Sequence, residues 1–108
     1  MRRALRVAEA AALPCVVSSA LETSVGLAAQ LALAGALPHL DFACGLGTLN
    51  LFDGDVVTDS LRPVDGHLLV PTTPPTPNPE LLQRFRHPAP ERTEWWRARL
   101  NRVRRLLN

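Results

Sequence analysis

The sequence contains no lysine and no tyrosine, and its 108 residues include only two cysteines and three histidines. Without lysine the chain has no ε-amino group to serve as a general base or to form a Schiff base, which excludes lysine-dependent catalysis by its own residues. The two cysteines and scattered histidines do not supply the four ligands of a structural zinc site. The longest apolar stretch, residues 25–37, is interrupted by Gln30 and is shorter than the roughly 20 residues that cross a bilayer. We therefore expect neither a zinc site nor a membrane anchor.

Length and composition indicate a small soluble protein. A chain of 108 residues makes at most one domain and is too short for a whole (β/α) barrel, which takes about 250 residues. Apolar residues make up 46% of it and charged residues 20%, as in globular proteins. Cys15 and Cys44 lie in apolar, strand-like segments, where we expect reduced core residues. This use of cysteine is typical of a cytoplasmic protein.

Positive charge is concentrated at the C-terminal end. The net charge is only +2, but the segment from Glu80 onward holds eight arginines and three glutamates. Such a segment could bind nucleic acid or anionic lipid, although a solvated helix face is the commoner explanation. Trp95 and Trp96 could stack on bases, but only one of them lies on the apolar stripe of its helix. We therefore interpret them as packing residues and expect no nucleic-acid partner.

The first half of the chain has the pattern of α/β units. Residues 2–12 have a helical pattern that lacks an N-cap and ends before Pro14. Residues 15–19 resemble a short buried strand. The segment Ser19-Ala20-Leu21-Glu22 then fits a capping box, which predicts a helix from there to about Leu37. Apolar residues surround nearly all of this helix, so we expect it to be buried on several sides.

The next segment continues the α/β pattern. A second short strand is predicted over residues 41–44, followed by Gly45-Leu46-Gly47-Thr48. Thr48 can cap a further helix, whose apolar positions are Leu49, Phe52, Val56 and Val57.

Residues 61–107 do not continue the α/β pattern of the first half. Residues 61–70 predict a hairpin that turns on Asp65-Gly66. Five prolines within residues 71–79 indicate an extended linker. Asn78-Pro79 is a helix start for a short helix to Phe85. A last helix is predicted over residues 91–107, with one apolar stripe formed by Trp96, Leu100, Val103 and Leu107.

Ser18 and Ser19 are the strongest candidates for ligand contact. They follow a predicted strand and precede a helix, where hydroxyls can donate to a carboxylate or phosphate beside the positive helix end. The alternative is that Ser19 only caps the helix and Ser18 only satisfies the turn.

Other polar residues are weaker candidates. Gly45 and Gly47 do not form a dinucleotide fingerprint, because Asn50 occupies the third glycine position. They either let backbone amides approach a ligand or make the turn. We interpret Glu22 as a capping residue, and Asp53 and Asp55 as solvated residues at a helix end.

Several separated segments together resemble one family. The run from Val17 to Leu27 looks like the seventh-strand segment of the o-succinylbenzoate synthase family, within the enolase superfamily. The segment Ala43-Cys44-Gly45-Leu46-Gly47-Thr48 resembles its eighth strand in the actinobacterial form. Residues 55–57, residues 61–66 and Trp95-Trp96 also follow that form. The resemblance therefore extends over almost the whole chain.

The resemblance implies a specific chemistry. Members of the family combine a capping α+β domain with a modified (β/α) barrel and bind Mg²⁺ through three carboxylates on the third, fourth and fifth strands. Lysines on the second and sixth strands flank a cyclohexadiene carboxylate, which is dehydrated to 2-succinylbenzoate in menaquinone biosynthesis. The resemblance places Ser18, Ser19 and Gly45 beside the succinyl arm of that small-molecule substrate.

The same resemblance implies that this chain is a C-terminal portion of an α/β barrel enzyme. Residues 1–58 would hold strands seven and eight with their helices, and residues 59–108 would form a tail that associates with the capping domain. The lysines and the Mg²⁺ ligands would lie upstream of Met1, so we expect the chain alone to bind no Mg²⁺ and to be inactive. Two parallel strands would leave exposed edges, which favours self-association. A small arginine-rich binding module and a decayed, non-catalytic subunit remain the alternatives.

Overall fold

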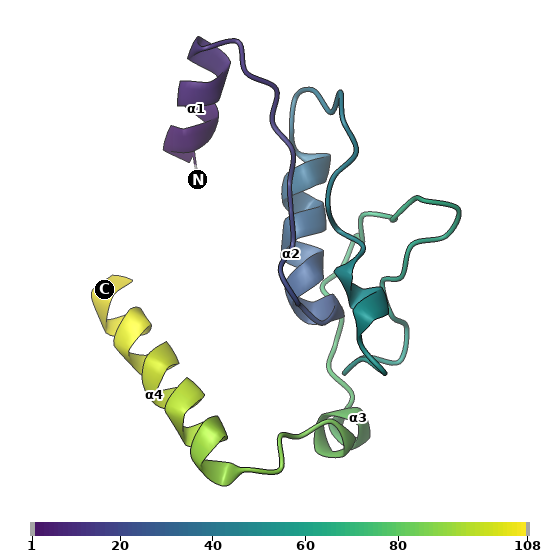
Figure 1. Ribbon diagram of the computed structural model, residues 1–108, viewed down its shortest axis with the longest axis vertical. Helices are drawn as coiled ribbons and strands as arrows, with labels where there is room; N and C mark the ends of the chain where they lie inside the picture. The colour runs from purple at the N-terminus through teal and green to yellow at the C-terminus, as the bar shows by residue number, and fades with distance from the viewer. Residues whose placement is uncertain (1, 108) are drawn as a thin grey trace.

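The computed structural model describes residues 2–107, and within them the regular structure is helical (Figure 1). The elements are α1 (Arg2–Ala10), α2 (Ser24–Gly35), a 3-10 helix η1 (Thr48–Leu51), α3 (Pro79–Arg84) and α4 (Pro90–Leu107). Figure 1 shows α2 and the loops after it side by side in the middle of the chain, with α1 and α4 standing apart. No helix among residues 2–107 is both long enough and apolar enough to cross a bilayer.

The turn predicted at Asp65-Gly66 and the helix cap predicted at Asn78 are confirmed. Asp65 and Gly66 both adopt positive φ (49° and 76°), as a type I′ turn requires, and the flanking Val64 and His67 exchange two backbone hydrogen bonds of 2.9 Å. The side chain of Asn78 accepts hydrogen bonds from the backbone N–H groups of Glu80 and Leu81 (2.8 and 3.2 Å) and so caps α3. These features depend on neighbouring residues alone.

The two predicted strands are reduced to a single parallel bridge. Ser18 pairs with Gly45, through hydrogen bonds from Ser19 N–H to Gly45 C=O (2.9 Å) and from Gly45 N–H to Val17 C=O (3.0 Å). The prediction of strands over 15–19 and 41–44 is therefore wrong in extent, although the parallel pairing itself is present. An isolated pair of strands is at best marginally stable in water, because each strand lacks its second neighbour.

The predicted start of α2 is also wrong. The helix begins at Ser24 with Thr23 as the N-cap residue, so Ser19 and Glu22 do not form a capping box. It ends at Gly35, two residues before the predicted end. Only one of its faces is buried in this structure, because Val25 on the other side is 41% exposed.

The helix predicted after Thr48 is a single 3-10 turn. Gly47, not Thr48, is its N-cap residue, and the turn stops at Leu51. Gly54 and the following buried segment interrupt the helical pattern that Val56 and Val57 suggested. The backbone after η1 instead runs as a loop that returns to the start of α2.

The core is small and lies between α2 and these loops. Leu27 and Leu49 are almost completely buried, and the same cluster includes Val17, Leu31, Ala34 and Leu46. Gly35, at the end of α2, faces Val70, since a Cβ there would lie 3.1 Å from Val70 Cγ2. No two helices in the described part of the chain pack extensively against each other.

The molecule exposes more surface than a compact protein of its size. Its accessible surface is 8849 Å², whereas a folded monomer of 11.8 kDa has about 5,900 Å². Its radius of gyration is 16.3 Å, against about 13 Å for a compact domain of this length. Large apolar side chains on α1, α4 and the loops account for part of the excess, for example Leu69 and Leu106. The structure is therefore more open than a compact domain of this length.

Candidate functional site

The parallel bridge brings the three predicted site residues together. Ser18 and Ser19 lie on one segment, and Gly45 lies opposite Ser18 on the other. A side chain at position 45 would crowd this pairing, because a Cβ there would lie 3.1 Å from Ser18 Oγ. Gly45 thus leaves room for the hydroxyl that stands beside it.

The two serines differ in what their hydroxyls contact. Ser19 is half-buried; its hydroxyl lies 3.2 Å from the Gly45 carbonyl and 2.9 Å from Thr48 Oγ1. Ser18 is exposed, and its hydroxyl makes one long hydrogen bond, 3.4 Å, to the Ser19 carbonyl. Ser19 therefore ties the two segments together, while the Ser18 hydroxyl has capacity left for a ligand. Thr48, interpreted from sequence as a helix cap, is instead a partner of Ser19.

Glycine 45 gives a direct test of this arrangement. Gly45→Val is expected to destabilise the fold by about 1–3 kcal/mol, because its Cβ and methyl groups would crowd Ser18 and loosen the bridge. Gly47→Val is the matched control: no atom lies within 4 Å of a Cβ at Gly47, so its cost should stay below about 0.5 kcal/mol. Urea unfolding followed by far-UV circular dichroism measures both, and equal losses would contradict the packing described.

A buried carboxylate near this site was missed in the sequence. Asp55 is only 6% exposed, which corrects its interpretation as a solvated residue. The backbone N–H groups of Ser24 (3.2 Å) and Val56 (2.7 Å) donate to its Oδ1, and the Ser24 hydroxyl donates to its Oδ2. The Leu61 N–H in turn donates to Ser24 Oγ (2.8 Å). Asp55 therefore joins the first residue of α2 to the loop over residues 55–61.

The charge state of Asp55 follows from these contacts. Burial by itself would raise the pKa of Asp55, but the hydrogen bonds from Ser24, the Val56 N–H and Ser60 outweigh it and leave the pKa below its ordinary value. The carboxylate also lies at the N-terminal, partially positive end of α2, which favours its ionised form. Asp55 is thus a structural anion, and its oxygens are already engaged.

Glu22 has a structural role other than capping. Gln30 Nε2 donates to Glu22 Oε1 at 2.8 Å, across the first turns of α2. The side chain of Glu22 also lies against Gly26, where a Cβ would come within 3.0 Å of it. Glu22 is held along the helix surface and is not directed at Ser18 by any hydrogen bond.

The donor set does not fit a Mg²⁺ site. Among residues 2–107, no three Asp, Glu, His or Cys side chains come close enough to share a metal ion. Asp55, the buried carboxylate, is hydrogen-bonded to Ser24 and Val56. Mg²⁺ requires near-octahedral oxygen ligands, and these residues do not provide them.

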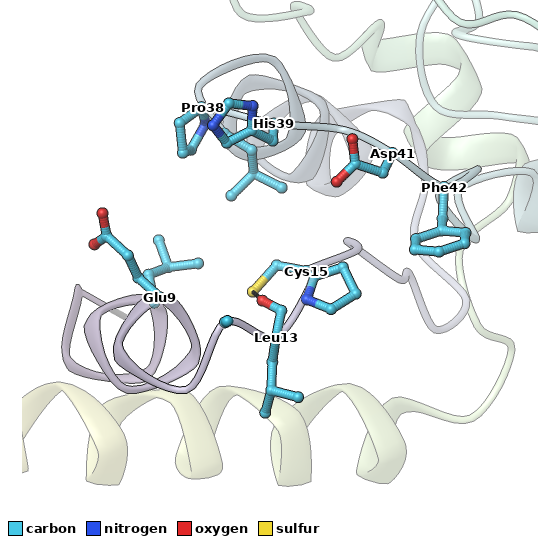
Figure 2. A pocket seen from close by; sticks show the side chains of 11 residues that line it. Glu9, Leu13, Cys15, Pro38, His39, Asp41 and Phe42 are labelled. Atoms are coloured by element: carbon cyan, nitrogen blue, oxygen red, sulfur yellow. Dashed lines mark hydrogen bonds between the residues drawn. The ribbon is translucent and has the colours of Figure 1, made fainter.

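One hollow in the described part of the chain lies away from the serines. Its volume is about 610 Å³, and it is bounded by α1 with residues 12–15 on one side and residues 37–42 on the other. Figure 2 shows Glu9 on α1 facing the segment that bears Pro38 and His39, with Cys15 on the same wall as Leu13. This hollow lies beyond the C-terminal end of α2, whereas Ser18 and Ser19 precede its N-terminal end. It is therefore separate from the candidate ligand site.

Cys15 and Cys44 are both free and half-buried. Cys44 Sγ accepts a hydrogen bond of 3.4 Å from the Val17 N–H, next to the bridge. The prediction of unpaired cysteines is confirmed, whereas full burial in the core is not.

Comparison with known proteins identifies relatives over nearly the whole chain. The enolase C-terminal domain-like family, whose fold is of the TIM-barrel type, matches residues 1–74. The o-succinylbenzoate synthases of Mycobacterium tuberculosis (strain H37Rv) and Mycobacterium leprae are 50% and 48% identical to the chain over 103 residues. These alignments cover 95% of this chain and 30% of each relative. The o-succinylbenzoate synthase of Thermobifida fusca is 63% identical over 70 residues, which are 65% of this chain and 22% of that protein. The chain thus spans about 30% of the length of the mycobacterial relatives.

Proposed function

Because the chain belongs to the enolase C-terminal domain-like family, we propose that it supplies part of the barrel domain of an o-succinylbenzoate synthase. The observation that supports this most directly is the identity of 48–63% to proteins of that name. In this proposal residues 1–58 correspond to the last two βα units of the barrel. Residues 59–108 correspond to a C-terminal tail that contacts the capping domain.

The proposed role of the chain is to form one wall of the substrate pocket. The exposed Ser18 hydroxyl would donate to a carboxylate of the substrate, and Gly45 would leave the space for it. Ser19 would hold the wall in place, since its hydroxyl is engaged with Gly45 and Thr48. The small-molecule substrate is proposed to be the cyclohexadiene carboxylate that becomes 2-succinylbenzoate, in a cytoplasmic, menaquinone-forming pathway.

The reacting groups are proposed to lie outside this chain. Proton abstraction next to a carboxylate needs a general base and a group that stabilises the enediolate. The chain has no lysine, and its described carboxylates do not gather as metal ligands. We therefore assign the base and any Mg²⁺ site to other parts of the enzyme, and no step of the reaction runs through a metal held here.

A chimera tests this assignment. The 103 residues of the Mycobacterium tuberculosis synthase that match this chain would be replaced by the matching residues of this chain. We expect the chimera to dehydrate the cyclohexadiene carboxylate within about tenfold of the parent kcat/KM, because most packing positions are retained. A folded chimera without activity would contradict the proposal.

Within that chimera, Ser18→Ala is expected to raise KM about tenfold or more with little change in kcat. The lost hydrogen bond to a charged carboxylate is made equally in the ground state and the transition state. Thr72→Ala, at an exposed linker position, is the control and should leave KM unchanged. Steady-state kinetics of both variants would contradict the role of Ser18 if their KM values were alike.

A further inference from the structure

Helix α4 presents an apolar stripe that nothing in the described structure covers. Its members are Trp96, Leu100, Val103 and Leu107, which are 44–81% exposed. They follow one another at steps of four, three and four residues, the spacing of the a and d positions of a coiled coil. The helix has 18 residues, about 27 Å of length, and Figure 1 shows it apart from the core.

Arginines border this stripe on both sides. At 3.6 residues per turn, Arg97 and Arg104 lie on one flank, at the e positions, and Arg92 and Arg99 lie on the other, at the g positions. The Arg99 guanidinium also lies over the rings of Trp95 and Trp96, 5.7 and 5.8 Å from their centroids. This contact holds one arginine at the edge of the stripe.

The flanking charges exclude a second copy of α4 as the occupant. In a parallel pair of such helices, the g position of one faces the e position of the other, which would place Arg99 against Arg104. In an antiparallel pair, e faces e and g faces g, which again places arginine against arginine. Like charges at these positions disfavour self-pairing.

The width of the stripe argues against a lipid surface. A helix that lies in a membrane interface buries a broad apolar face, whereas four residues at a and d positions form the narrower seam of a helix pair. The other large exposed apolar side chains of α4, Trp95 and Leu106, lie at c and g positions, outside this seam and on the flank that holds Arg99. Nucleic acid is also a poorer explanation. Its phosphates would bind the arginines, but they would not account for the ordered apolar stripe between them.

We propose that α4 docks against an acidic amphipathic helix, which under the proposed function belongs to the capping domain that the tail contacts. That helix would bear apolar residues at its own a and d positions and Glu or Asp at e and g, opposite the four arginines. Burial of the apolar seam would supply affinity, and the charge pairs would select the partner and its register. The proposed docking of α4 does not depend on whether Ser18 contacts a substrate.

The two tryptophans allow a direct measurement on the full chain. Both lie in α4, and the protein has no other tryptophan and no tyrosine, so tryptophan emission reports on this helix alone. A synthetic 21-residue helix with Leu at a and d and Glu at e and g is the probe. Titration is expected to shift the emission to shorter wavelength and to saturate. A peptide with Lys at e and g should give no shift.

Charge reversal distinguishes a docking seam from general attraction between opposite charges. The double variant R97E/R104E should bind the Glu peptide at least about tenfold more weakly and should gain binding to the Lys peptide. The matched control R102E/R105E makes the same change of charge on the opposite face and should stay within about threefold of the parent chain. The gain of binding shows that R97E/R104E still presents its helix.

Three results would overturn the proposal: equal weakening by the two double variants, an equal shift with phosphatidylglycerol vesicles or duplex DNA, or a shift that grows with protein concentration alone. The last of these would identify a second copy as the occupant.

Discussion

The 108-residue chain, assayed alone with Mg²⁺ and the cyclohexadiene carboxylate, is expected to show no turnover above the uncatalysed rate. Enzymes of this kind of chemistry accelerate their reactions by at least about a millionfold, and a positioned base alone contributes about a hundredfold to ten-thousandfold. This chain has no lysine, and its buried carboxylate Asp55 accepts three hydrogen bonds, two from Ser24 and one from the Val56 N–H. We therefore expect that the chain, taken alone, cannot remove the proton.

Loss of substrate absorbance over hours, with and without the chain, measures this result. The control is the chimera described above, which contains the same Ser18 and Gly45 but includes the rest of the barrel. Turnover that scales with the concentration of the purified 108-residue chain would contradict the assignment of the base to other parts of the enzyme.

The second prediction with a large expected effect concerns the contribution of Asp55 to the stability of the fold. Asp55→Ala should destabilise the fold by roughly 2–4 kcal/mol, because the buried hydroxyl and N–H of Ser24 and the N–H of Val56 would lose their acceptor. Small domains have only about 5–15 kcal/mol of stability in total, and this core is small. We therefore expect a markedly lower urea midpoint for the variant than for the parent chain, measured by far-UV circular dichroism.

Asp53 offers a control two residues away. It is exposed, so Asp53→Ala should change the free energy of unfolding by less than about 0.5 kcal/mol. If the two alanine variants lost the same stability, the contacts of Asp55 with Ser24 would not be the cause.

The same carboxylate predicts a pH dependence. The pKa of Asp55 is lower in the folded chain than its ordinary value, so its stabilisation is fully present above about pH 4 and is lost as pH falls through the folded pKa. Asp55→Asn should be less stable than the parent at pH 7, and the difference should shrink on acidification. A difference that stays constant from pH 7 to pH 3 would contradict this.

The parts of the fold that could be predicted from sequence depend on near neighbours. The turn at Asp65-Gly66 and the cap at Asn78 need only the residues beside them, and both are confirmed. The family resemblance could also be recognised, because its segments occur in order along the chain, and the relatives confirm it.

The parts that could not be predicted depend on residues far apart in the chain. Ser19 was interpreted as a helix cap, but its hydroxyl is taken by Gly45 and Thr48, which lie 26 and 29 residues later. Asp55 was interpreted as solvated, because nothing near it in sequence indicates that Ser24, 31 residues away, would bury it. The strands were overpredicted for a related reason: extended segments need partners on both sides. How the division at residue 58 relates to separate domains stays a prediction.

The bridge between Ser18 and Gly45 also has a consequence for the order in which the chain folds. Ser19 and Gly45 are 26 residues apart, so a disordered connection would pay a large entropy of loop closure before any contact formed. Helix α2, with 12 residues, spans only about 18 Å of that connection and can form on the microsecond timescale. The early helix shortens the loop and carries its two ends toward each other. We therefore expect the helical tendency of the Ala-Leu sequence in α2 to influence the folding rate, and the pairing of Ser18 with Gly45 to form after the helix.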